Sequence, residues 1–346
     1  MKNIIWLLSI ILVYSIGCKK GDSAQTTGNT SVTVVNKDTS FAKGADVSWL
    51  TQMEASGYKF YNNSGTQQDC IQILKDKGMN AIRLRVWVNP VGGWCNTADM
   101  VTKAKRATAL GMKILIDFHY SDTWADPGDQ TKPVAWANMD FNTLVTTVHD
   151  YTKAVIDTLK LNGVTPTWVQ VGNETSDGML WEDGRASTNM ANFAKLIAAG
   201  YQGVKDASNT TKVIVHLANG YDNTTFRWLF DGLKSNGAKW DIIGMSLYPT
   251  ASNWQTYNTE CLANMNDMVS RYGTPVMICE SGFSASDATT AKAFLTDLIS
   301  KTRSVSNNNG LGVFYWEPEA YNWMSYGLGA FDDTGRPTVA LDAFAN

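Results

Sequence analysis

The chain has 346 residues, of which 44% are hydrophobic, so it is long enough for one large domain or two ordinary ones. A formal net charge of −3 and a charged fraction of 18% exclude the strongly basic surface that nucleic-acid binding needs. Thirteen tryptophans and thirteen tyrosines are many for this length. Most will pack in a core, but aromatic faces outside it suit stacking on neutral, ring-shaped ligands.

Residues 1–18 have the pattern of an export signal. Lys2 supplies a positive charge, and the apolar stretch of residues 4–16 is too short to span a bilayer. Residues 15–18 resemble a bacterial lipoprotein processing site, which would make Cys18 the lipidated first residue of an outer-membrane or cell-surface protein. Ordinary cleavage, with secretion or release into the periplasm, is the alternative.

Residues 19–40 are rich in Ser, Thr, Gly and Asn without an apolar period, which predicts a flexible tether. The denser pattern that begins at Phe41 predicts a single catalytic domain over residues 41–346. The remaining cysteines have no metal-ligand spacing, and their pairing is left open. We expect Cys279, which lies in an apolar run, to be a buried thiol. These cysteines are Cys70, Cys95, Cys261 and Cys279.

From residue 41 onward, short apolar runs alternate with segments of helical period. The predicted strands are residues 43–47, 81–86, 113–118, 167–171, 212–217, 240–246, 275–279 and 312–316. The helical segments include residues 69–75, 97–110, 141–161 and 189–207. This alternation predicts an α/β fold, a single (β/α)₈ TIM barrel. A doubly wound open sheet is the runner-up, but no GxGxxG motif follows the first strand.

Two glutamates follow predicted strands at the end of the barrel where substrate is met. Glu174 follows the fourth strand and Glu280 the seventh, each after an apolar run where an unpaired charge would be costly. Glycoside hydrolysis needs such a pair, because one carboxyl protonates the departing oxygen and the other attacks or stabilises the sugar. A structural salt bridge with Arg83 or Arg85 is the alternative for either glutamate alone.

Four segments near the strand ends have distinctive sequences: residues 83–90 (RLRVWVNP), 117–128 (DFHYSDTWADPG), 169–174 (VQVGNE) and 315–319 (YWEPE). They resemble the signature blocks of glycoside hydrolase family 53. The resemblance implies a retaining endo-β-1,4-galactanase that acts on the galactan of type I arabinogalactan and pectin, here in a bacterial lipoprotein form. It also implies that Glu174 is the acid/base and Glu280 the nucleophile.

The resemblance suggests roles for further residues in the matched blocks and at other strand ends. We expect Asn173 to hydrogen-bond the sugar 2-hydroxyl, Arg85 to keep the nucleophile ionised and Tyr248 to orient that nucleophile. Trp316 is expected to form the floor under the sugar at the cleaved bond. His119 is expected to bind a sugar hydroxyl, beside Asp117.

Trp124, Asp126 and Trp136 are expected to line neighbouring subsites, with simple packing as the alternative. For the two other histidines, His149 and His216, we expect core positions with satisfied hydrogen bonds.

The chemistry implied by the resemblance needs no cofactor, and a structural calcium ion stays open with no ligands assigned. The expected partners are β-1,4-galactan chains and a membrane reached through the lipid anchor, and we expect a monomer. Two rival functions are a similar barrel enzyme acting on mannan or xylan, and a non-catalytic glycan-binding lipoprotein. The second rival has no need for two strand-end glutamates beside Asn173.

Overall fold

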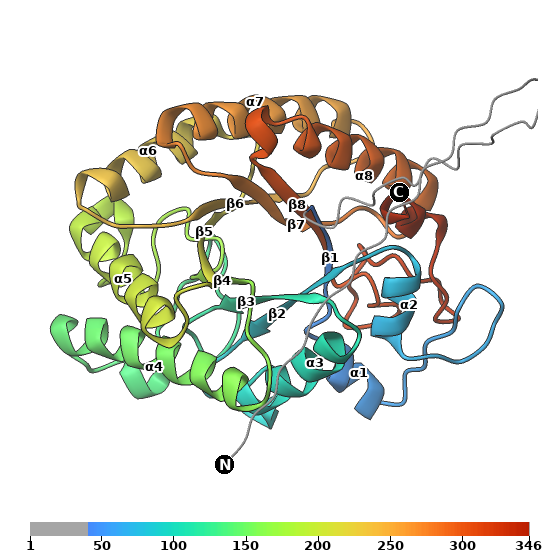
Figure 1. Ribbon diagram of the computed structural model, residues 1–346, viewed down its shortest axis with the longest axis horizontal. Helices are drawn as coiled ribbons and strands as arrows, with labels where there is room; N and C mark the ends of the chain where they lie inside the picture. The colour runs from blue at the N-terminus through green and yellow to red at the C-terminus, as the bar shows by residue number, and fades with distance from the viewer. Residues whose placement is uncertain (1–40, 346) are drawn as a thin grey trace, which may run out of the picture. The chain divides into compact units, whose positions relative to one another are not determined.

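The computed structural model describes residues 41–345. The predicted signal of residues 1–18, Cys18 itself and the tether of residues 19–40 lie outside the described residues. Eight parallel strands close into a barrel in chain order, with the first strand paired to the eighth. Figure 1 shows the helices as an outer ring around these strands. The predicted (β/α)₈ barrel is therefore confirmed.

The strands agree closely with the predicted runs. They are β1 (Ala42–Asp46), β2 (Ala81–Val86), β3 (Lys113–Phe118), β4 (Trp168–Val171), β5 (Lys212–Leu217), β6 (Ile242–Leu247), β7 (Val276–Ser281) and β8 (Gly310–Trp316). The main difference is at β7, which continues two residues beyond the predicted end because Glu280 and Ser281 still pair with Ser246 and Leu247 of β6. Glu280 is therefore held within the sheet ladder rather than on a loop.

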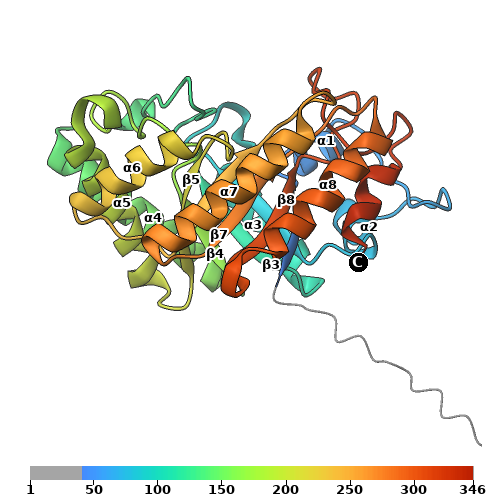
Figure 2. The same ribbon diagram turned by 90° about the horizontal axis from the view of Figure 1, so that it is seen from above.

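The helices cover the outside of the barrel, and α7 and α8 lie alongside each other in Figure 2. The α-helices are α1 (Leu50–Ala55), α2 (Cys70–Asp76), α3 (Thr97–Ala109), α4 (Phe141–Leu161), α5 (Ala186–Ala207), α6 (Asn223–Ser235), α7 (Trp254–Tyr272) and α8 (Ala288–Arg303). Short 3₁₀ helices are η1 (Val91–Gly93), η2 (Val134–Trp136), η3 (Ser306–Asn308) and η4 (Val339–Phe344). No helix between residues 41 and 345 is both long enough and apolar enough to cross a membrane.

Side-chain caps explain where several helices begin. Each capping side chain accepts a hydrogen bond from a backbone N–H of the first turn, which has no partner inside the helix. The caps are Asp69 of α2, Asn96 of α3, Asp140 of α4, Asp222 of α6 and Asp287 of α8. Helix α7 is followed by the capping residue Gly273, whose φ of 68° is a left-handed conformation that glycine adopts without steric cost.

The barrel interior is apolar at one end and charged at the other. Side chains from all eight strands form a separate apolar cluster, whose members are Ala42, Ala81, Leu115, Trp168, Ile214, Ile242, Met277, Cys279 and Phe314. Further along the strands, inward positions carry Asp46, Arg83, Asp117, Gln170 and His216, all fully buried. Because such groups are costly to bury without partners, this polar layer must be paired internally.

The described cysteines are all buried free thiols, so no disulfide links them in this structure. Cys279 lies in the apolar cluster of the barrel interior, as predicted. Burial raises the pKa of the Cys279 thiol, which keeps it protonated.

Candidate active site

The turn after β4 aims Glu174 at the mouth of the barrel. Gly172 begins this turn with a φ of 88°, and a Cβ on it would come within 2.5 Å of the Thr175 side chain. Glu174 itself has a φ of 44°, in the left-handed region that residues other than glycine rarely adopt. The surrounding contacts hold the residue there, which is common at functional sites.

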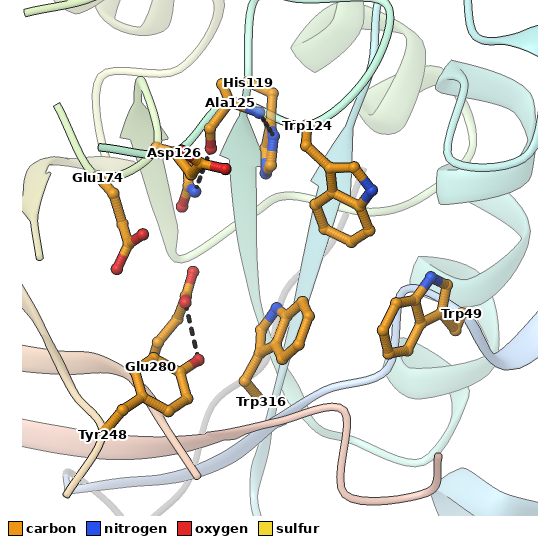
Figure 3. Close-up of a pocket in the computed structure, with 10 residues that line it drawn as sticks. Trp49, His119, Trp124, Ala125, Asp126, Glu174, Tyr248, Glu280 and Trp316 are labelled. Atoms are coloured by element: carbon orange, nitrogen blue, oxygen red, sulfur yellow. Dashed lines mark hydrogen bonds between the residues drawn. The ribbon is translucent and has the colours of Figure 1, made fainter. Parts of the chain in front are cut away.

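Glu174 and Glu280 lie in a pocket of about 280 Å³ at the C-terminal ends of the strands. Figure 3 shows their two carboxyl groups facing each other, with tryptophan rings to one side. The lining residues are Trp49, His119, Trp124, Ala125, Asp126, Asn173, Glu174, Tyr248, Glu280 and Trp316. The pocket thus brings together the predicted site residues, apart from Arg85, Asp117 and Trp136, and adds Trp49 and Ala125.

Arg83 is the charge partner of Glu280. Its Nη2 lies 2.6 Å from Oε1 of Glu280 and 2.9 Å from Oδ2 of Asp117, and its Nη1 lies 2.6 Å from Oδ2 of Asp46. The hydroxyl of Tyr248 donates a 2.9 Å hydrogen bond to the other oxygen of Glu280, in line with the expected orienting contact. Glu280 is therefore fixed at both oxygens.

Arg85 was expected to keep Glu280 ionised, but the arginine that pairs with Glu280 is Arg83. Both arginines point into the barrel because they lie two residues apart on β2. Arg85 is the nearer of the two to the strand end, and its Nη1 pairs with Glu317 rather than with Glu280. Periodicity could place both arginines inside, but only the three-dimensional arrangement decides which carboxylate each one meets.

Asn173 is held beside Glu174 by both ends of its amide. Its Oδ1 accepts a 2.9 Å hydrogen bond from Arg83, and its Nδ2 donates one of 2.8 Å to the carbonyl of Ala125. Asn173 is 5% exposed and lines the pocket, and these two hydrogen bonds fix the orientation of its amide.

A buried chain that sequence reasoning missed leads to Glu174. Nδ1 of His216 accepts hydrogen bonds from Gln170 and from the Glu174 backbone N–H, so Nε2 carries the hydrogen and donates it to Ser246 Oγ at 2.8 Å. The Ser246 hydroxyl in turn hydrogen-bonds the Glu174 carboxyl. Burial, and then the charge of Arg83, lowers the pKa of His216, which keeps the ring neutral. The sequence around His216 contains no motif that would have predicted this contact.

The other two histidines, His119 and His149, lie in different surroundings. Nδ1 of His119 accepts from the Ala125 N–H at 3.0 Å, and its Nε2 lies 3.0 Å from Oδ2 of Asp117. His119 reaches the pocket, whereas Asp117 lies beneath it. The core position expected for His149 was wrong, because that ring lies at the helix surface between Asp150 and Asp206.

Packing is the role that the structure assigns to Trp136, which is buried against the rings of Tyr120 and Tyr151 and does not line the pocket. Trp124 and Asp126 do line it. Over residues 41–345, no three His, Cys, Asp or Glu side chains gather in an arrangement that could hold a metal ion.

Residues 42–342 match the family model described as glycosyl hydrolase family 53. The chain belongs to glycosyl hydrolase family 53. The family 53 match spans the whole described barrel, including both facing glutamates.

Named relatives of this family 53 enzyme share about a third of its residues. A probable arabinogalactan endo-β-1,4-galactanase A of Neosartorya fischeri is 37% identical over 80% of this chain and 83% of its own length. An arabinogalactan endo-β-1,4-galactanase of Thermothelomyces thermophilus is 35% identical over 87% of this chain and 98% of its own. A solved fungal β-1,4-galactanase superposes with a TM-score of 0.80 at 31% identity, covering 88% of this chain and 98% of its own.

The charge state of the family 53 carboxyl pair follows from its surroundings. Burial raises the pKa of both Glu174 and Glu280, and the charge of Glu174 raises that of Glu280 further. The pair therefore retains one proton more readily than two separate carboxyls would. Arg83 opposes the rise at Glu280, with which it pairs directly. This ion pair favours the charge on Glu280, while burial and the neighbouring Glu174 raise the pKa of Glu280 to about 8.

Proposed function

We propose that this protein is a retaining endo-β-1,4-galactanase that cuts the galactan chains of type I arabinogalactan and pectin. One observation carries the proposal: two facing carboxyls in one pocket have opposite surroundings, with a cation and a phenol on Glu280 and a neutral hydroxyl on Glu174. The galactanase names of the relatives supply the substrate class.

In the first step, the ionised Glu280 attacks the anomeric carbon while Glu174 gives its proton to the departing glycosidic oxygen. The bond between sugar and leaving group breaks, and an ester between the galactosyl unit and Glu280 forms. Arg83 and the Tyr248 hydroxyl hold the attacking carboxylate in position. Asn173 hydrogen-bonds the 2-hydroxyl, a contact that strengthens towards the transition state.

In the second step, Glu174 acts as a base and removes a proton from water, which attacks the same anomeric carbon. The ester breaks, Glu280 leaves as a carboxylate and Glu174 is protonated again. Two displacements at one carbon restore the β configuration. Trp316 provides an apolar surface under the sugar at the cleaved bond.

The first experiment is digestion of β-1,4-galactan, β-mannan and xylan by the purified protein, with product sizes followed over time. We expect release of mixed oligosaccharides from galactan alone, and proton NMR in the first minutes should show the β anomer. Faster cleavage of mannan or xylan would contradict the substrate assignment, and galactan binding without products would indicate a non-catalytic glycan-binding protein.

We further propose that Cys18 is lipidated and anchors the enzyme to the outer membrane or cell surface. The supporting pattern is Lys2, the apolar residues 4–16 and the cysteine that follows them. Mass spectrometry of the N-terminal peptide should show an acylated cysteine, and Cys18→Ser should move the enzyme from the membrane fraction to the soluble fraction. An unmodified N-terminus beyond residue 18 would indicate ordinary secretion.

A further inference from the structure

Arg85 is buried with an incomplete set of hydrogen bonds. Only 1% of the residue is exposed, and its Nη1 pairs with Glu317. Its Nε and Nη2 are also buried and have no hydrogen-bond acceptor among the described residues. Because buried donors without partners are costly, something else around the guanidinium must compensate them.

Three indole rings surround this guanidinium. Its central carbon lies 4.4 Å from the ring centroid of Trp124 and 5.2 Å from those of Trp49 and Trp87. These distances are within the range for cation–π attraction, which reaches to about 6 Å and strengthens when the cation is removed from water. We call Trp49, Trp87 and Trp124 the tryptophan cage.

The tryptophan cage is also part of the pocket wall. Trp49 and Trp124 line the pocket together with Trp316, whose ring centroid lies 5.1 Å from that of Trp49 and 5.8 Å from that of Trp124. In Figure 3 these rings lie to one side of the two carboxyls, with Trp49 farthest from Glu174. Trp87 contacts the edge of Trp124 but does not itself line the pocket.

The cage rings come from three separate connections of the barrel. Trp49 lies between β1 and α1, Trp87 directly follows β2, and Trp124 lies between β3 and α4. Arg85 is the contact that all three share. Its partner Glu317 adds a second contact, because Oε2 of Glu317 accepts a 3.1 Å hydrogen bond from the backbone N–H of Trp49.

We infer that Arg85 is a positioning residue that holds the tryptophan cage in place as a stacking wall for the sugar units next to the one being cleaved. The inference rests on the proposed function for the nature of the sugar chain. Arg85 does not line the pocket, so it acts through the rings. A wall of this kind contributes to binding of the chain in both the ground state and the transition state, so its loss should raise KM more than it lowers kcat.

The principal test is Arg85→Lys, assayed on galactan and on galacto-oligosaccharides of increasing length. Lysine keeps the positive charge near Glu317 but lacks the planar guanidinium that stacks on indole rings. We expect KM for long chains to rise about tenfold, the equivalent of one to two cation–π contacts, with kcat within about twofold of wild type. Arg271→Lys, on the outer helix α7 beside Tyr272, is the matched control and should change neither constant.

A folded Arg85→Lys enzyme with wild-type KM would overturn the inference, and so would a loss confined to kcat. If Arg85→Lys does not fold, Trp87→Leu tests the inference instead, because Trp87 belongs to the tryptophan cage without lining the pocket. A raised KM in Trp87→Leu supports the cage, and an unchanged KM overturns it.

A readout without substrate separates this inference from the proposed function. The near-ultraviolet circular dichroism of the clustered tryptophans should change in Arg85→Lys and not in Arg271→Lys. If wild-type protein releases nothing from galactan, the proposed function fails while this spectrum still tests the cage. An unchanged spectrum would then overturn the cage by itself.

Discussion

Arg83 lies 2.6 Å from Glu280, and this single contact makes two otherwise similar carboxyls chemically different. Both are in the same pocket and both are removed from water, which favours protonation of each. The Arg83 guanidinium lowers the pKa of both carboxyls, but it forms its ion pair with Glu280. One carboxyl is thereby suited to attack and the other to donate a proton.

Replacing Arg83 by lysine should move the acid limb of the pH–rate profile to higher pH, by about one unit. The reason is that a less directly placed cation stabilises the ionised Glu280 less, so the pKa of Glu280 rises. The measurement is kcat/KM for galactan between pH 3 and 9. The control is Arg227→Lys, because Arg227 pairs with Asp267 at the protein surface. An acid limb that stays at its wild-type pH would contradict the assigned partner.

Replacing Glu174 by alanine should lower activity on native galactan by about 10²–10⁴-fold, the usual effect of losing a general acid. A galactoside with a dinitrophenol leaving group needs little proton donation, so its first step should be largely spared. Added azide should then restore turnover by attacking the ester on Glu280, and NMR should identify a β-galactosyl azide. An α-galactosyl azide would contradict retention.

Ser246→Ala should shift the basic limb of the pH–rate profile. The Ser246 hydroxyl stabilises the charged form of Glu174, so its removal raises the pKa of Glu174 and moves the basic limb to higher pH. We expect kcat to fall a few-fold, as for a neutral hydrogen bond worth about 1 kcal/mol. Ser246→Thr keeps the hydroxyl and should retain the wild-type limb. A shift of the acid limb instead would refute the link between Ser246 and the proton donor.

Glu319→Gln should make folding stability less dependent on pH. Burial, and then the charge of Glu317, raises the pKa of Glu319, so the folded protein holds a proton that the unfolded chain releases above about pH 4.3. Wild-type stability therefore falls as pH rises above that value, by up to about 1.4 kcal/mol per pH unit from this group.

Glutamine carries no such proton and can donate its amide to Glu317 instead. The advantage of Glu319→Gln over wild type should grow from pH 5 to pH 8 in urea unfolding experiments. Glu260→Gln, at an exposed position on α7, is the control. A difference that stays constant across this range would show that Glu319 is ionised in the folded protein.

Local pattern predicted most of the architecture. Strands β2, β3 and β5 have the predicted bounds, because their apolar runs and flanking turn residues agree with their burial in the sheet. The end of β7 was placed too early because a charged residue usually stops a buried strand. Pairing with β6 and the Arg83 guanidinium make that position favourable for Glu280, and neither is visible in local sequence.

By itself, the sequence determined that strands and helices alternate, that Glu174 and Glu280 lie at strand ends, and that the motif blocks belong to a glycoside hydrolase. These follow from periodicity and from short segments whose residues are neighbours in the chain. Only the tertiary structure decided the pairings: Arg83 with Glu280, Arg85 with Glu317 and the tryptophan cage, and His216 with Ser246. Closing the barrel brings distant strands within hydrogen-bonding range, where differences of a few ångströms decide which charges meet.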